Sequence, residues 1–420
     1  MSIYGAMFSG VSGLSAQSRA LGMISDNISN VNTVGYKSTK AQFATLVTQS
    51  INKEVYTPGG VRAKPDQQVD KQGLLQSSAS GTDIAVSGNG FFVVNEAASP
   101  GLGNDYLFTR AGSFDRDASG NLRNTAGYYL QGWELDSTGQ PVGNTSVLSS
   151  LKTVNIANLS GTARATTTAE IGANLPSTAA VSDTQDISVQ VYDSLGNAHD
   201  VTLTFTKTGA NAWSYAVSAP VLAGTSTASG TVASGGTGSI TFDGNGVPTA
   251  ITQPPIGITW TTGGATASTI ALDIGTVGEL GGITQFAGQF SIGKIDQDGV
   301  RFGEYSGVTI SEEGVVTALF DNGETKDIYK IPVAQFSNPN GLGARDGNAY
   351  LQTSQSGDVT LSGANSGGAG KIAPGALEAS NVDLAEEFTD MIVTQRAYSA
   401  SAKVITTADE MLDELIRIRR

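Results

Sequence analysis

Two stripes of apolar side chains, one at each end of the chain, constrain this sequence more than any other feature. The N-terminal stripe consists of Met7, Val11, Leu14, Leu21, Ile24, Ile28 and Val31. The C-terminal stripe consists of Leu384, Phe388, Met391, Ile392, Tyr398, Ile405, Leu412, Leu415 and Ile416. In both stripes the spacing is helical and a seven-residue interval recurs, which is typical of helices that pack along a seam. The sequence therefore predicts a terminal helix at each end that is built to pack against other helices.

The two predicted helices differ in their local signals. The first, over about residues 4 to 31, contains three glycines, each of which costs about 1 kcal/mol relative to alanine. These glycines are Gly10, Gly13 and Gly22. The second helix has Asn381 or Asp383 as a cap, and Glu386 and Glu387 lie in its first turn, where negative charge is favoured. We expect this second helix to be on the order of 50 Å long, at about 1.5 Å per residue.

Between the two ends the pattern changes to short alternating strands. Strand–turn–strand patterns cover residues 84–94, 114–133, 187–205 and 308–320, and each turn contains Asp, Asn, Glu or Gly. The chain has 53 glycines in 420 residues and only 7% aromatics, which suits a β-rich protein with many tight turns. Residues 207–275 are especially rich in Gly, Ala, Ser and Thr, so we expect weakly specified β-structure there.

Two segments connect the ends to this middle region. In residues 36–70 we expect a short helix around Phe43 to Val47, followed by an irregular segment near Pro58. Residues 363–370 have low complexity and are predicted to form a flexible linker.

Several short motifs imitate binding sites. Gly367 to Lys371 is similar to part of a phosphate loop, but Asn365 and Ile372 occupy positions that need Gly and Ser or Thr. The segment from Asp115 to Asn121 spaces oxygen ligands like a calcium loop, yet Ala126 replaces the bidentate Glu. The segment 296–299 is a shorter match. We interpret the first motif as linker and the other two as structural turns.

The composition argues against catalysis and cofactors. There is no Cys, and the only His is His199, which we interpret as a solvated turn residue rather than a general base. The neighbouring Asp200 would point to the opposite face of a strand. We therefore expect no enzymatic activity, no cofactor and no metal site. The net charge of −14 disfavours a nucleic-acid partner and anionic membranes, and no apolar run is long enough to span a bilayer.

The terminal helices carry the functional prediction. If they paired only with each other, the flanks of both would remain exposed. Our hypothesis is that the ends fluctuate in the monomer and become ordered when neighbouring copies surround them. Repeated head-to-tail contacts of this kind produce open helical polymers.

Two long motifs carry a family resemblance. Residues 9–14 with residues 26–37, and residues 380–387 with residues 392–411, are similar to the opening and closing helices of bacterial flagellar rod and hook proteins. Residues 191–207, together with Trp213, resemble the outer β domain of hook proteins. A distal rod protein would be much shorter and would lack this insertion. The resemblance covers nearly the whole chain and is least recognisable over residues 218–275.

The resemblance implies a mainly β fold with terminal α-helices and nested domains. An inner helical polymerisation domain would combine both termini, and the outer β domain would be inserted in the middle one. The implied segments are 1–35 and 376–420 for the inner domain, 36–70 and 363–375 for the connections, 71–145 and 285–362 for the middle domain, and 146–284 for the outer domain.

The resemblance also implies function, location and partners. Hook proteins polymerise into a curved, hollow tube that acts as a universal joint between the motor rod and the filament. The implied partners are other copies of the chain, rod, hook-cap and hook–filament junction proteins, and the flagellar type III export apparatus. Because residues 1–10 lack the pattern of a signal peptide, we expect export without a cleaved signal. The alternatives are a distal rod or other axial protein and, with less support, a secreted β-rich adhesin or glycan-processing enzyme.

Overall fold

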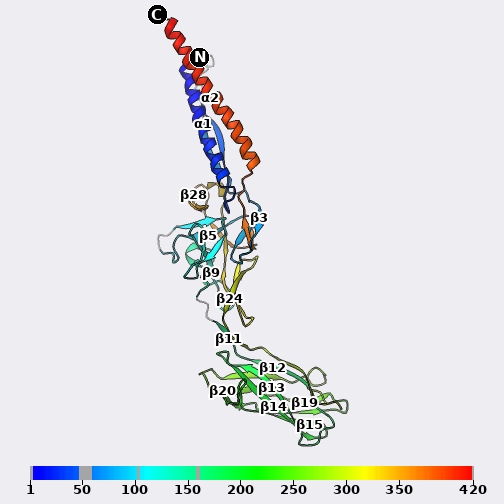
Figure 1. Cartoon of the computed structure of the whole chain (residues 1–420). Helices are drawn as coiled ribbons and strands as arrows, with labels where there is room; N and C mark the ends of the chain where they lie inside the picture. Colours follow the sequence, from blue (N-terminus) through cyan, green and yellow to red (C-terminus); the bar gives the residue numbers. More distant parts are fainter. Residues whose placement is uncertain (1–2, 47–58, 102–104, 158–160, 419–420) are drawn as a thin grey trace. The chain divides into compact units, whose positions relative to one another are not determined.

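The computed structural model describes residues 3–46, 59–101, 105–157 and 161–418, and the chain divides into two compact units. The first unit comprises Met1–Asn158, Val308–Ala318 and Lys326–Arg420, and the second comprises Leu159–Gly307 and Leu319–Thr325. Figure 1 follows the chain through both units. In the described residues α-helices occur only at the two ends and the rest is mainly β, which confirms the predicted fold class.

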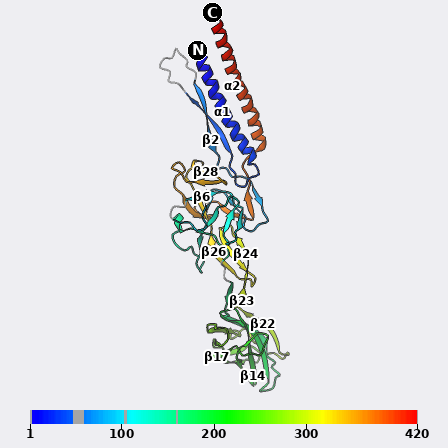
Figure 2. The same ribbon diagram turned by 60° about the vertical axis from the view of Figure 1, so that its left-hand side comes forward.

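The terminal helices α1 (Ile3–Ser29) and α2 (Leu384–Ile418) pack side by side in the first unit (Figures 1 and 2). Of the two predicted caps, Asp383 is the one used. Its carboxylate accepts hydrogen bonds from the backbone N–H groups of Ala385 (2.8 Å) and Glu386 (3.3 Å). These donors would otherwise have no partner within the helix, so the cap fixes where α2 begins.

A β-hairpin lies along α1, where the sequence had predicted a short helix. Strands β1 (Thr39–Leu46) and β2 (Gly60–Gln67) pair antiparallel, and Figure 2 shows the hairpin beside α1. The prediction of a helix over Phe43–Val47 was therefore wrong for the described residues Phe43 to Leu46, while Val47 lies outside them. Pairing with a distant strand overrides the weak local preference of such a short segment.

The β body of the first unit is built around one large sheet, of which only residues 305–307, 319–320 and 325 are counted with the second unit. Its main path is β24 (Tyr305–Ile310), β25 (Val315–Phe320), β26 (Thr325–Lys330), β9 (Tyr129–Glu134), β5 (Phe91–Asn95), β6 (Tyr106–Thr109), β29 (Ala349–Leu351) and β28 (Gly343–Arg345). Attached to this path are β7 (Phe114–Arg116), β8 (Leu122–Asn124), β10 (Lys152–Thr153), β27 (Pro332–Gln335) and β30 (Thr360–Gly363). Its core includes edge-to-face rings, with Phe108 and Phe336 4.7 Å apart. Two short antiparallel pairs complete the unit, β3 (Leu75–Ser77) with β32 (Ala376–Glu378) and β4 (Ile84–Ser87) with β31 (Lys371–Pro374).

The segment 363–370 is an ordered turn rather than a flexible linker, so that prediction was wrong. Ala364 and Ala369 are buried. The backbone N–H of Asn365 donates to the carbonyl of Gly370 (3.1 Å), and the N–H of Gly370 donates to the carbonyl of Asn89 (2.7 Å). Small residues here permit close packing against the β body, which low complexity alone does not reveal.

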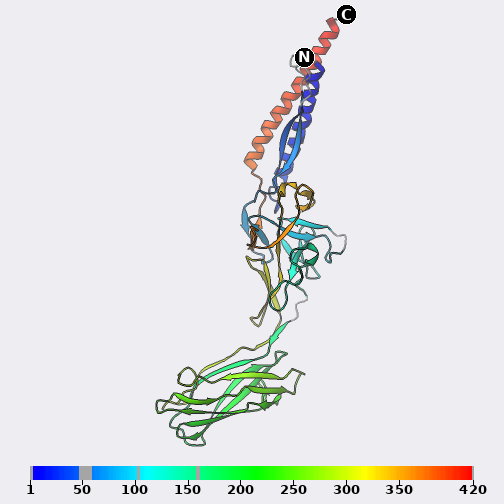
Figure 3. The same cartoon turned by 180° about the vertical axis from the view of Figure 1, so that it is seen from behind.

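The second unit contains two sheets that share one core (Figure 3). The first sheet is ordered β17 (Gly230–Ser234), β20 (Ile256–Trp260), β21 (Ser268–Asp273), β12 (Thr168–Asn174) and β22 (Ser291–Gln297). The second is ordered β13 (Thr184–Tyr192), β14 (Ala198–Gly209), β15 (Ala212–Val217), β18 (Thr237–Phe242) and β19 (Pro248–Thr252), with β16 (Val221–Leu222) on β14. A separate ribbon joins β11 (Thr162–Arg164) to β23 (Val300–Gly303). Residues 285–307, which the sequence assigned to the middle domain, lie in this unit because β22 pairs with β12.

Tight turns built on aspartate recur in both units. The carboxylate of Asp117 accepts the backbone N–H groups of Ser119 and Asn121, each at 2.8 Å. Asp193 accepts those of Leu195 and Asn197, each at 2.9 Å. The intervening glycine of the Asp193 turn, Gly196, has a φ of +82°, which favours glycine. The carboxylate of Asp117, in the segment that is similar to a calcium loop, therefore acts as an acceptor for the backbone of its own turn.

His199 is fully buried, so the prediction of a solvated histidine was wrong. Its Nδ1 lies 2.7 Å from the Ser229 hydroxyl, its Nε2 lies 3.3 Å from Asp193, and its ring stacks on Trp260 at 4.2 Å. Burial alone would raise the pKa of Asp193, but its hydrogen bonds, led by those from Asn197, hold the pKa below its usual 3.8. The histidine thus joins a turn to a neighbouring strand inside the core.

We predict that Asp193→Ala destabilises the second unit by about 2–3 kcal/mol, because it leaves buried donors unsatisfied. Asp243→Ala is the matched control, since Asp243 accepts Asn245 and Val247 in an equivalent but more exposed turn. It should cost clearly less, because water can replace the lost hydrogen bonds of an exposed turn. Urea unfolding measures both, and equal losses would contradict the role of burial.

Candidate assembly surface on the terminal helices

The two terminal helices approach each other through small residues. A Cβ atom added to Gly10 would lie 2.9 Å from Ile405 Cγ1, and one added to Gly13 would lie 3.1 Å from the Ser401 hydroxyl. These two glycines, which weaken the isolated helix, therefore lie where α2 leaves little room for a side chain. Gly22 has open space around it and no such role.

This close approach buries little large apolar surface. In the described parts of α1 and α2, the buried apolar side chains are Ala16, Ala20, Ile24 and Ala408. Only Ile24 among them is large. At about 25 cal/mol per Å² of apolar surface removed from water, small side chains contribute little stability. The helix pair therefore leaves most of its apolar stripes available for other contacts.

The residues of the two predicted stripes fall into three groups. One group is exposed and consists of Val11, Leu384, Phe388, Ile392, Tyr398 and Ile416. A second group is partly buried and consists of Met7, Leu14, Leu21, Ile28, Val31, Met391, Ile405 and Leu412. Ile24 alone is buried, Val31 follows the end of α1, and the side chain of Leu415 lies outside the described residues.

The sequence did not single out several exposed apolar residues. Phe8 follows Tyr4 by four residues and Val11 follows Phe8 by three, so the three side chains share one helical face. They are 74% (Tyr4), 61% (Phe8) and 54% (Val11) exposed. On α2 the additional residues are Val393, Val404 and Met411. The helical spacing of Tyr4 and Phe8 was visible in the sequence, but neither residue belongs to the seven-residue repeat on which the prediction was based.

A buried asparagine joins α1 to both of its neighbours. The side-chain oxygen of Asn27 accepts the backbone N–H of Thr39 (2.9 Å) and the hydroxyl of Tyr36 (3.2 Å). Its amide nitrogen donates to the Thr39 carbonyl (3.0 Å) and to Glu387 (2.9 Å). Asn27 is 1% exposed, so these bonds fix how α1, α2 and the hairpin meet.

Four family models match segments that together run along most of the chain. "Flagella basal body rod protein" matches residues 7–37, and "Flagellar hook protein FlgE/F/G D1 domain" matches residues 85–190. "Flagellar basal body protein FlaE D2 domain" matches residues 158–300, and "Flagellar basal body rod FlgEFG protein C-terminal" matches residues 373–418. With the paired terminal helices, these matches define the class as a flagellar axial protein.

Relatives that align over nearly the full length of the chain show which family within this class it belongs to. The chain is 37% identical to the flagellar hook protein FlgE of Brucella suis and 36% identical to that of Rhizobium meliloti, each over 100% of both chains. It is 32% identical to that of Salmonella typhimurium, over 97% of this chain and 98% of the relative. The chain therefore belongs to the flagellar hook protein family and is a structural subunit of the hook.

A solved structure agrees at the level of fold. The crystal structure of Helicobacter pylori flagellar hook protein FlgE2 matches with a TM-score of 0.50 and 15% identity, over 72% of this chain and 100% of that one. None of the described helices has the length and apolar character needed to span a membrane.

We predict that Glu387 gives the helix pair a specific pH dependence. Burial raises the pKa of Glu387 above 4.5, and the hydrogen bond from Asn27 only partly opposes this. Stability from this group is therefore fully present below pH 4.5 and is lost as the pH rises through the higher folded-state value. Glu387→Gln should remove this decrease in stability with rising pH, and it keeps the side chain nearly the same size.

The measurement is the free energy of unfolding at several pH values, followed through the helical signal. The quantity compared is the difference between wild type and variant at each pH. Taking the difference cancels carboxylates elsewhere, such as Asp193, whose lowered pKa acts in the opposite direction. Parallel pH profiles for the two proteins would contradict the prediction.

Proposed function

We propose that this hook subunit polymerises through the outward-facing apolar surfaces of α1 and α2, each of which binds neighbouring copies. The observation that supports this most strongly is the exposure of Phe388 (50%) and Ile392 (51%) on helices whose mutual contact uses glycines. Contiguous exposed apolar surface on a soluble chain marks an interaction site. Leu384, Phe388 and Ile392 follow one another at intervals of four, so one face of α2 supplies such a surface.

The remaining parts of the proposal concern mechanics. The terminal helices would form an inner domain that maintains the tube, and the β-rich parts would form the middle and outer domains. Polar Ser, Thr, Asn and Gly surfaces suit contacts that change with little desolvation, as bending of a universal joint requires. The ends would gain order as neighbouring copies cover them.

The proposed partners follow from the family. They are the rod, the hook cap and the hook–filament junction proteins, with export through the flagellar type III apparatus and no cleaved signal peptide. Assembly is the property that the terminal helices support directly.

We predict that the double variant Phe388→Ser, Ile392→Ser raises the critical concentration for polymerisation at least about tenfold. Each buried large apolar side chain contributes about 1.5–3 kcal/mol, and 1.4 kcal/mol corresponds to tenfold in affinity. Because both side chains are exposed in the monomer, its free energy of unfolding should change by no more than about 0.5 kcal/mol. Sedimentation of polymer against total concentration gives the critical value.

Val142→Ser, Val147→Ser is the matched control. These valines are 52% and 42% exposed on the β body of the same unit, so the variant removes similar exposed apolar surface away from the helices. It should polymerise like wild type. An equal effect of the two double variants, or no effect of either, would count against the helices as the assembly surface.

A further inference from the structure

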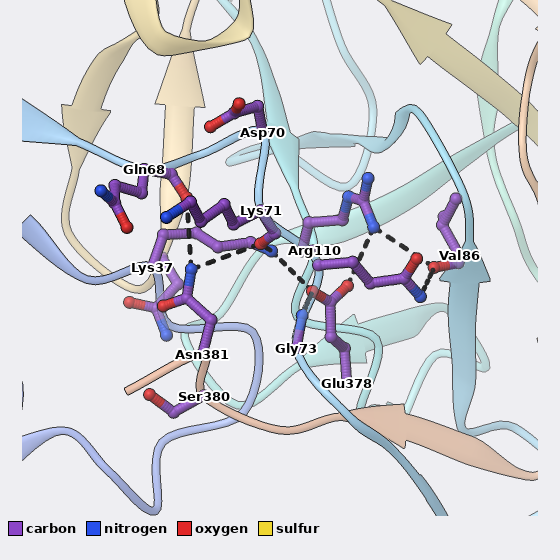
Figure 4. Close-up of polar contacts among 12 residues, drawn as sticks. Lys37, Gln68, Asp70, Lys71, Gly73, Val86, Arg110, Glu378, Ser380 and Asn381 are labelled. Carbon is purple, nitrogen blue, oxygen red and sulfur yellow. Dashed lines mark hydrogen bonds and ion pairs between the residues drawn. The ribbon is translucent and has the colours of Figure 1, made fainter. Parts of the chain in front are cut away.

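A buried carboxylate lies where the chain enters and leaves the terminal helices. Glu378, the last residue of β32, is fully buried. Its Oε1 accepts hydrogen bonds from Lys37 Nζ (2.6 Å) and from the backbone N–H of Gly73 (2.8 Å), and its Oε2 accepts from Arg110 Nη1 at 3.0 Å (Figure 4). Three segments that are far apart in the sequence therefore meet at one side chain.

The two cations are themselves anchored to the backbone. Lys37 also donates to the carbonyl of Lys71. Arg110 donates to the carbonyls of Val86 (3.2 Å) and Gly88 (2.7 Å). Lys37 thus ties the segment that follows α1, and Arg110 ties the β body, to the same carboxylate.

Backbone contacts also connect the segment that precedes α2 to the segment that follows α1. We call these two segments the roots of the helices. The N–H of Gly35 donates to the carbonyl of Glu378 (2.8 Å), and the N–H of Ser38 donates to the side chain of Asn381 (2.7 Å). The Asn381 amide in turn donates to the carbonyl of Lys71 (3.3 Å; Figure 4). Gly35 has a φ of +68°, and a Cβ there would lie 2.6 Å from the nitrogen of Ala111.

The charges make Glu378 the group on which this arrangement depends. Two buried cations, Lys37 and Arg110, share one buried anion, and both ion pairs are almost fully shielded from water. Removing one cation leaves a balanced pair, whereas removing the anion takes away the carboxylate that is paired directly with both cations. Breaking a buried pair in that way is strongly destabilising.

We propose that Glu378 is a positioning residue for assembly, joining the roots of α1 and α2 to the β body so that both helices present their apolar surfaces together. The joint consists of Lys37, Gly73, Arg110, Glu378 and Asn381. This inference rests on the proposed function of the helices as the assembly surface. It adds that a residue outside the apolar helix surfaces holds both helices in position for assembly.

Glu378→Gln tests the proposal, with hydrogen exchange and polymerisation as readouts. Without the anion, exchange in residues 30–40 and 376–386 of the monomer should rise together, at least about tenfold, while β5 and β9 keep their protection. The critical concentration for polymerisation should rise at least about tenfold. Adding Lys37→Met to Glu378→Gln should recover part of the assembly, because it removes one of the two uncompensated cations.

Lys37→Met alone separates positioning from general stability. It leaves the Glu378–Arg110 pair intact, so exchange should rise in residues 30–40 and not in 376–386. Glu312→Gln is the matched control, because Glu312 pairs with Lys371 at 2.9 Å on the exposed surface of the same unit. It should behave like wild type in every readout.

The proposal is overturned if Glu378→Gln polymerises at the wild-type critical concentration, or if only one of the two segments loses protection. It is also overturned if β5 and β9 lose protection equally, since Glu378 would then simply support folding. Failure of the helix surface itself is a separate outcome. It would appear as normal polymerisation of the Phe388→Ser, Ile392→Ser variant.

Discussion

The close approach of α1 to α2 through glycine is the constraint on which the rest of the account depends. Gly10 and Gly13 allow Ile405 and Ser401 to come near the α1 backbone. A helix pair formed in this way buries mostly alanine-sized side chains, and its large apolar residues other than Ile24 remain partly or largely exposed. The described helices therefore leave apolar surface uncovered, and we propose that other copies of the chain cover it.

An exposed apolar helix pair can make the same contacts in every copy of a polymer only if its orientation relative to the β body is fixed. Within the first unit, two buried polar centres connect the helices to their surroundings. Asn27 holds α1 against α2 and the hairpin, and Glu378 ties the roots of both helices to the β body. Both centres lie within or beside the two terminal motifs that carry the family resemblance, which gives those motifs a physical explanation.

Periodicity in the sequence was sufficient to predict the helices, the aspartate turns and three pairs of neighbouring strands, β7 with β8, β13 with β14 and β24 with β25. The strands predicted over residues 84–94 form, but they do not pair with each other, because β4 pairs with β31 and β5 pairs with β6, β9 and β27. It could not predict features that depend on distant pairing. The hairpin containing Phe43 depends on strand β2, and the environment of His199 depends on Ser229, just before β17, and on Trp260 in β20. A seven-residue repeat likewise identified the apolar stripes but not which side of α1 faces the partner helix, because the glycines of α1 rather than its large residues lie against Ile405 and Ser401. Glu378 was missed because an isolated glutamate carries no pattern.

The most direct test of the account uses single-cysteine labelling, since the natural chain has no cysteine. Ile392→Cys and Phe8→Cys place a thiol on the exposed faces of α2 and α1, and Val142→Cys places one on the β body. The account predicts rapid modification of all three in the monomer, with at least about tenfold slower modification of the two helix positions in the polymer. Equal reactivity of the helix positions in monomer and polymer, or protection already present in the monomer, would contradict it.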